Sequence, residues 1–255
     1  LPLYQPVRLA EDLAVADNLS NGRIEIGVGL GYVPRDFAGY GLSTTQRLSR
    51  TEEGLEILTR CFAGKRFTFE GKRYQARDVE IKPSYVQPGG PPLWVAASSP
   101  EGAKRAARFN AHLLPQGPYE TTIQVWIDEL RSTGRSPRDY RVGIIKPVFV
   151  TENRDRDWPK IRAAERFRME YYAQAFKAAG RDAPPDQDKE RISQNWVVGD
   201  VDYCVSELTD FIKTNRITDL VTWAVPPGLR PGDVANSLQK FATKVVPRVK
   251  EILIS

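Results

Sequence analysis

Short apolar segments bounded by glycine, proline or polar residues recur along the chain. Such segments are typical of strands buried on both faces of a parallel sheet, because neither face needs polar side chains. The pattern predicts five strands of this kind, at residues 23–29, 93–97, 111–115, 144–150 and 219–225. Residues 66–82 alternate instead, with Phe67 and Phe69 before a Glu70-Gly71 turn, which predicts a hairpin.

Apolar residues at helical spacing fill the intervals between these strands. They predict helices at 6–19, from Thr44 or Thr45 to Gly64, at 100–109, 119–132, 157–179 and 201–212, and near the end of the chain, where Pro247 is expected to bend or end the helix. Strands that alternate with helices favour an α/β fold with a parallel sheet. Because no long linker interrupts the 255 residues, one domain over 1–255 is expected.

A glycine-rich stretch after the first strand is the first candidate site. Gly27, Gly29 and Gly31 remove side chains from the carboxyl end of the strand, so a flat or charged ligand can approach the backbone closely. A dinucleotide-binding fingerprint is disfavoured, because the third glycine comes one place early and a loop rich in glycine and proline is expected after it instead of a helix. The glycines predict either a sharp bend or a cofactor site at a strand end.

The step Ser98-Ser99-Pro100-Glu101 is the second candidate site. Serine is a good N-cap, proline fits the first turn of a helix, and glutamate suits the positive end of the helix dipole. The free N–H groups at such a helix start can bind an anion. Simple capping and anion binding explain the step equally well.

Composition narrows the class of protein. The net charge of +5 is modest and the basic residues are mixed with acidic ones, which disfavours nucleic acid as a partner. Cys61 and Cys204 lie far apart in sequence, which predicts free buried thiols in the reducing cytoplasm. A single histidine without paired cysteines disfavours a metal site, and no apolar run is long enough to span a membrane.

Several motifs occur together in one order along the chain: DNLSNGR at 17–23, GVGLG at 27–31, PPLWV at 91–95, Ser98-Ser99-Pro100, and Val197-Val198-Gly199. Together they resemble the bacterial luciferase-like flavin-dependent monooxygenases. The resemblance implies a (β/α)8 TIM barrel, usually dimeric, that binds reduced FMN at the carboxyl ends of its strands, or the deazaflavin F420 in one branch of the family.

The resemblance also implies which residues touch the cofactor. The segment after the first strand would pass beside the flavin ring and phosphate; it consists of Gly29, Leu30, Gly31 and Tyr32. The phosphate would be bound by Ser98 and Ser99. Gln116 would face the same cofactor site at the carboxyl ends of the strands, and Trp223 would flank the ring. Luciferases carry a cysteine and an arginine where this chain has Gly29 and Leu30. The missing arginine removes a charge-assisted phosphate contact, which keeps F420 open as the alternative to FMN.

The start of the chain matches the middle of the family's barrel. Leu1 to Pro6 resembles the end of the third strand and its loop, so only about the last five strands are expected here. The rest is expected to lie outside this sequence, to have been removed, or to come from another chain. The family's usual catalytic histidine would lie in that part, so no catalytic residue is predicted. Residues 151–196, where the resemblance is weakest, are expected to form a lid that selects the substrate.

Other conspicuous residues are expected to be structural. Trp94 lies inside a strand and is assigned to the core, His112 is expected to be a hydrogen-bonded structural histidine, and Arg23 with Glu11 is expected to form an ion pair. For Tyr32 the alternative is an ordinary packed loop aromatic, and for Trp223 it is a core residue.

Three functions fit these expectations. The first is a flavin-dependent monooxygenase that receives reduced FMN from a separate reductase and uses O2 on a small organic substrate. The second is an F420-dependent dehydrogenase on the same scaffold, and the third is a truncated, non-catalytic flavin-binding subunit. A homo-oligomer is expected in each case.

Overall fold

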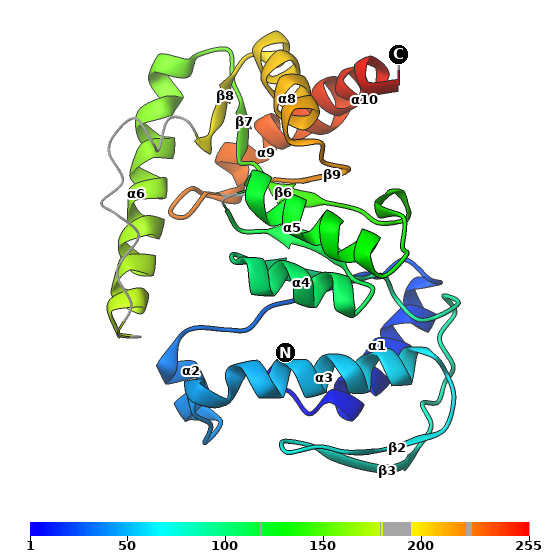
Figure 1. Cartoon of the computed structure of the whole chain (residues 1–255). Coiled ribbons are helices and arrows are strands. Elements are labelled where there is room, and N and C mark those ends of the chain that lie inside the picture. The colour runs from blue at the N-terminus through cyan, green and yellow to red at the C-terminus, as the bar shows by residue number, and fades with distance from the viewer. Residues whose placement is uncertain (118, 179, 181–194, 223–225, 255) are drawn as a thin grey trace. The chain divides into compact units, whose positions relative to one another are not determined.

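A computed structural model describes the chain except residues 118, 179, 181–194, 223–225 and 255 (Figure 1). Contacts divide the chain into two compact units, Leu1–Val142 and Gly143–Ser255, and each is described by itself. That both belong to one barrel domain, with 151–196 as its lid, stays a prediction.

The first unit is built around a three-stranded parallel sheet in the order β1-β4-β5. Its elements are α1 (Pro6–Ser20), β1 (Ile26–Val28), α2 (Pro34–Gly39), a 3-10 turn (Thr44–Gln46), α3 (Arg47–Phe62), β2 (Phe67–Glu70), β3 (Gln75–Val79), β4 (Leu93–Ala97), α4 (Pro100–Arg108), β5 (His112–Pro115), α5 (Tyr119–Ser132) and a second 3-10 turn (Pro137–Asp139). Helices α4 and α5 pack on each other and against β5, and α4 also covers β4 (Figure 1).

The sheet has one strongly buried face. Val28, Val95 and Leu113 lie opposite one another in register, and each is at most 5% exposed. Side chains alternate between the two faces of a strand. Gly27, Ala96 and Leu114 therefore lie on the other face, where all three are less buried. Gly27 and Ala96 are the small residues among these three, beside the larger Leu114.

The predicted hairpin is confirmed as β2 and β3, and one carboxylate fastens its turn to α3. The carboxylate oxygens of Glu53 accept the backbone N–H groups of Lys72, Arg73 and Tyr74 at 3.1, 2.7 and 3.0 Å. An ionised carboxylate makes stronger hydrogen bonds than a neutral acceptor does. Glu53 thus fixes a two-stranded ribbon that would be marginal alone.

A second buried carboxylate lies on α1. Asp17 is completely buried, and its Oδ2 atom accepts the backbone N–H groups of Val86 and Gln87 at 2.7 and 3.0 Å. Its Oδ1 atom accepts the side-chain amide of Gln87 at 2.8 Å, and that amide also donates to the carbonyl of Ile24 at 2.9 Å. One aspartate therefore joins α1 to the segments that lead into β1 and β4.

The ion pair expected between Arg23 and Glu11 is wrong. Glu11 pairs with Arg8 one helical turn away at 3.2 Å, while the Nε atom of Arg23 donates to the carbonyl of Ser20 at 2.6 Å. Residues three apart on a helix are neighbours, so the local partner prevails over the distant one.

The second unit contains two pairs of parallel strands, β6-β9 and β7-β8, with helices on them. Its elements are β6 (Gly143–Ile145), β7 (Val148–Val150), α6 (Arg154–Ala178), β8 (Val197–Gly199), α8 (Val201–Asn215), β9 (Asp219–Val221), α9 (Pro231–Lys240), a π-helical turn (Phe241–Val245) and α10 (Val246–Ile254).

The expected count of five parallel strands is too low. The described residues contain seven strands in parallel pairs, namely β1, β4, β5, β6, β7, β8 and β9, and neither unit by itself closes a barrel. The single strand expected at 144–150 is two strands, because Pro147 has no N–H group to donate to a ladder. The other addition is β8, which is too short for a periodic signal.

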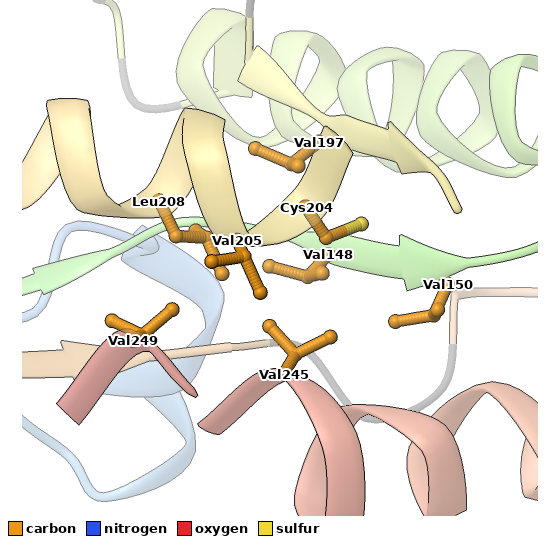
Figure 2. Close-up of a cluster of buried hydrophobic side chains, with 8 residues drawn as sticks. All are labelled: Val148, Val150, Val197, Cys204, Val205, Leu208, Val245 and Val249. Atoms are coloured by element: carbon orange, nitrogen blue, oxygen red, sulfur yellow. The ribbon is translucent and has the colours of Figure 1, made fainter. Parts of the chain in front are cut away.

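The core of the second unit forms where β7, β8, α8 and the C-terminal helices meet. Figure 2 shows Val148, Val197 and Val205 directed toward this cluster together with Cys204, and Val245 and Val249 close it from the C-terminal helices. Val245 is completely buried. The C-terminal helix continues past Pro247 instead of ending there, through a π turn in which the Val246 N–H donates to the Phe241 carbonyl.

Both cysteines are free and buried, as predicted. Burial raises the pKa of the Cys61 thiol to about 12 and that of the Cys204 thiol to about 12. Both side chains therefore remain protonated thiols, and they act as small apolar core residues.

Candidate functional site at the carboxyl edge of the first sheet

Three predicted cofactor segments follow three adjacent parallel strands. Gly29–Tyr32 comes after β1, Ser98-Ser99 after β4, and Gln116 after β5. Val28 pairs with Val95 and Val95 with Leu113, so the three strands end at the same edge of the sheet. The Gln116 N–H extends the ladder by donating to the Ala97 carbonyl at 2.7 Å. The topology brings the segments together, as ligand sites in α/β sheets require.

Of the two glycines after β1, the fold requires glycine at Gly31 but not at Gly29. Gly31 has φ +67°, and a Cβ atom built there would lie 3.1 Å from Cε2 of Phe37, so both backbone and packing require glycine. Gly29 has no positive φ, and a Cβ atom built there meets no atom of the described structure within 4 Å. Neither the backbone conformation nor packing within the described residues requires glycine at position 29.

The loop after β4 presents hydrogen-bond donors at its surface. Ser98 and Ser99 are both exposed. Ser99 caps α4, because its Oγ atom accepts the Gly102 N–H at 3.3 Å. Among the described residues no partner is found for the Ser98 hydroxyl or the Glu101 N–H. These donors lie at a helix N-terminus, where anions bind favourably.

Gly102 brings this helix start close to the strand. A Cβ atom built at Gly102 would lie 3.1 Å from Cβ and 3.3 Å from Cα of Ala97, the last residue of β4. Glu101, the acidic residue of the first turn, lies 3.5 Å from Lys104 and is exposed. The N-terminus of α4 is therefore held directly against the carboxyl end of its strand.

The two serines are expected to differ in their effect on stability. Replacing Ser99 with alanine removes the N-cap and should lower the free energy of unfolding by about 1 kcal/mol. Ser98→Ala is the matched control and should change it by less than about 0.5 kcal/mol, since the exposed side chain caps nothing. Urea unfolding of the two variants measures both values. Equal losses would contradict the capping role of Ser99.

Two features of this edge were not predicted from the sequence. The helix α2 follows the glycines directly, where a loop was expected; Pro34 at its first position and Asp36 in its first turn were the available signals. The second feature is the buried phenol of Tyr119, at the predicted start of α5 just past Gln116; burial raises its pKa, so the phenol stays neutral. An aromatic residue two places after Gly117 was the only signal for Tyr119.

The opposite edge of the sheet carries a structural cluster. The indole N–H of Trp94 donates to Glu25 at 2.5 Å, and the Arg141 guanidinium lies 4.6 Å from the centre of the Trp94 ring. The Nδ1 atom of His112 accepts a hydrogen bond from the backbone N–H of Arg141 at 3.1 Å. Trp94 is 6% exposed, which confirms that it is a core residue. The hydrogen bond that His112 accepts confirms its structural role. The hydrogen bond from Arg141, above all, lowers the pKa of Glu25.

Trp223, the remaining predicted cofactor residue, lies outside the described residues, as do residues 181–194 of the predicted lid. Within the part of the chain that is described, no group of three or more histidine, cysteine, aspartate or glutamate side chains could hold a metal ion. In the same part, every helix is too short or too polar to cross a bilayer.

Comparison with known proteins gives relatives of two cofactor types. The FMNH(2)-dependent dimethylsulfone monooxygenase of Pseudomonas fluorescens is 26% identical over 223 residues, which are 84% of this chain and 58% of that protein. The F420-dependent glucose-6-phosphate dehydrogenase of Mycolicibacterium gilvum is 24% identical over 268 residues, and the match covers 98% of this chain and 76% of that protein. The chain spans between 38% and 58% of the length of the first three curated relatives.

A solved structure supports the fold. The monooxygenase RslO1 from Streptomyces bottropensis superposes with a TM-score of 0.81 at 22% identity, over 96% of this chain and 75% of its own. The sequence model described as luciferase-like monooxygenase matches residues 1–215. The chain belongs to the luciferase-like monooxygenase family.

Proposed function

We propose that this protein is a flavin-dependent monooxygenase that binds reduced FMN and uses O2 to oxygenate a small organic substrate. The observation that carries the proposal is the meeting of Gly29–Tyr32, Ser98-Ser99 and Gln116 at one edge of the β1-β4-β5 sheet. A relative that is named as FMNH(2)-dependent supports the cofactor.

The residues at this edge suit an anionic cofactor with a flat ring. The Ser98 hydroxyl and the Glu101 N–H would donate to its phosphate at the start of α4, and Ser99 would hold that helix start in place. The open space at Gly29 would admit the ring against bare backbone, with Tyr32 beside it. Gln116 would offer an amide from the neighbouring strand, and Trp223 would flank the ring.

Reduced flavin supplies two electrons, with which one atom of O2 enters the substrate and the other leaves as water. The protein's part is to orient the ring and to exclude bulk water from it. Bare backbone at Gly29 and the hydrogen-bond donors at the start of α4 would hold the cofactor and orient it toward the substrate.

An F420-dependent dehydrogenase is the second candidate. The observation in its favour is Leu30, which stands where luciferases have an arginine, so the chain lacks one charge-assisted phosphate contact. An F420-dependent relative that covers nearly the whole chain supports it as well. In this case a hydride moves between substrate and cofactor, and O2 takes no part.

An anaerobic titration tests both candidates. The full-length protein is mixed with reduced FMN or with F420, binding is followed by cofactor fluorescence, and O2 is then admitted. The monooxygenase proposal predicts saturable binding of reduced FMN and oxygen uptake that rises with substrate. Binding of F420 alone, without oxygen uptake, would favour the dehydrogenase, and binding of neither cofactor would overturn both.

The proposal extends to the assembly. The two units would belong to one (β/α)8 barrel, in which residues 151–196 form the lid over the substrate. The protein would act in the cytoplasm as a homo-oligomer and receive reduced flavin from a separate reductase.

A further inference from the structure

The helix α2 follows the glycine loop and has little local support. It spans only six residues, and its N-cap residue Val33 makes no side-chain hydrogen bond. Helices this short are not stable by themselves, so a tertiary contact must hold α2 in place. Of its residues, Phe37 alone is buried, at 1% exposed.

Phe37 connects α2 to the glycine loop in two ways. Its ring lies under Gly31, since a Cβ atom built on that glycine would be 3.1 Å from Cε2 and 3.3 Å from Cζ. Its carbonyl accepts the N–H groups of Tyr40 at 3.0 Å and Leu42 at 2.9 Å, which closes the turn after the helix. The ring and the carbonyl thus fix both the loop before α2 and the chain after it.

The contact restricts where the loop can lie. Gly31 has φ +67°, and its Cα carries no side chain, so the backbone rests directly on the aromatic ring. Packed interiors transmit small displacements, because they contain few voids. A smaller side chain at position 37 would let Gly29–Tyr32 move away from the sheet edge without removing any group proposed to touch the cofactor.

We infer that Phe37 is a positioning residue for the cofactor, which it supports through Gly31 without touching it. The inference rests on the proposed function, because it assumes that the cofactor lies against Gly29–Tyr32. It assigns a role to α2 that neither the glycine pattern nor the capping of α4 supplies.

Phe37→Leu is the test variant, and Tyr40→Leu is the matched control. Tyr40 is an aromatic residue of the same segment but is 67% exposed. At a temperature where all variants remain folded, Phe37→Leu should bind the cofactor that the wild type binds roughly tenfold more weakly, because a loop that holds the binding conformation only about a tenth of the time loses affinity in proportion. Tyr40→Leu should bind it as the wild type does, and Phe37→Tyr should restore most of the affinity.

A double-mutant cycle with Gly31 separates positioning from stability. Gly31→Ala adds a methyl group against the Phe37 ring, and Phe37→Leu makes room for it, while the strain of the positive φ is the same in both backgrounds and cancels. The double variant should therefore bind the cofactor more tightly than the product of the two single losses predicts.

The outcomes distinguish this inference from the function on which it rests. If the wild type binds neither reduced FMN nor F420, the proposed function fails and this inference fails with it. If the wild type binds cofactor but Phe37→Leu binds it equally well while only its melting temperature falls, Phe37 is merely structural. Strictly multiplicative losses in the cycle would overturn the inference as well.

Discussion

Replacing Asp17 with alanine is expected to lower the free energy of unfolding by about 3 kcal/mol, since buried donors left unpaired cost about 1–3 kcal/mol each. Asp17 is completely buried and accepts the backbone N–H groups of Val86 and Gln87 and the side-chain amide of Gln87. Alanine leaves all three donors without this acceptor. Urea unfolding followed by circular dichroism measures the loss.

Asp12 on the same helix is the matched control. Its side chain is 57% exposed and, among the described residues, pairs only with Arg8 at 2.7 Å, so Asp12→Ala should cost less than about 0.5 kcal/mol. Asp17→Asn keeps one acceptor oxygen and should lose less than alanine does. Equal losses for Asp12→Ala and Asp17→Ala would show that the buried carboxylate does not hold the segment before β4.

The contribution of Asp17 should also depend on pH. Burial raises the pKa of its carboxyl group, but the hydrogen bonds from Gln87 and Val86 together lower it below the ordinary value. The folded protein therefore binds this proton less readily than the unfolded chain does. Its contribution is fully present above the ordinary aspartate pKa of about 3.9 and is lost as the pH falls further. The difference between the wild type and Asp17→Asn should shrink in acid.

Replacing Gly29 with valine is expected to weaken cofactor binding by a factor of about 10 to 100, because the added side chain would occupy the space proposed for the ring and such overpacking costs about 1–3 kcal/mol. The fold should tolerate the change, since Gly29 has no positive φ and its built Cβ atom meets nothing within 4 Å in the described structure. The measurements are the dissociation constant of the cofactor and the midpoint of urea unfolding.

Gly232 provides the control for this variant. It lies in α9, also has no positive φ, and a Cβ atom built there likewise meets nothing within 4 Å among the described residues. Gly232→Val should leave cofactor affinity unchanged. If Gly29→Val bound the cofactor as the wild type does, the ring could not lie against this glycine.

The elements with strong local patterns could be predicted from the sequence. The apolar run Leu93–Ala97 is β4 as predicted, and Tyr119–Ser132 is α5 at the predicted bounds. The first is a continuous apolar run between proline and serine, and the second is long enough for its helical period to show. The strand expected at 144–150 failed because Pro147 interrupts hydrogen bonding, which an apolar run alone does not reveal.

The site was predictable only as far as topology determines it. Parallel strands place their carboxyl ends at one edge, so Gly29 and Ser98 could be expected near each other once β1 and β4 were recognised. The contact between Gly31 and Phe37 could not be predicted, because it depends on a positive φ and on a helix too short for a periodic signal. Tertiary packing, more than local propensity, supports that helix.

A crystal structure of the full-length protein with its reduced cofactor, grown without oxygen, tests the central claim most directly. The account predicts the cofactor phosphate within hydrogen-bond distance of Ser98 and the start of α4, and the ring against Gly29. A cofactor bound elsewhere, for example beside Glu25 and Trp94 at the other edge of the sheet, would contradict it.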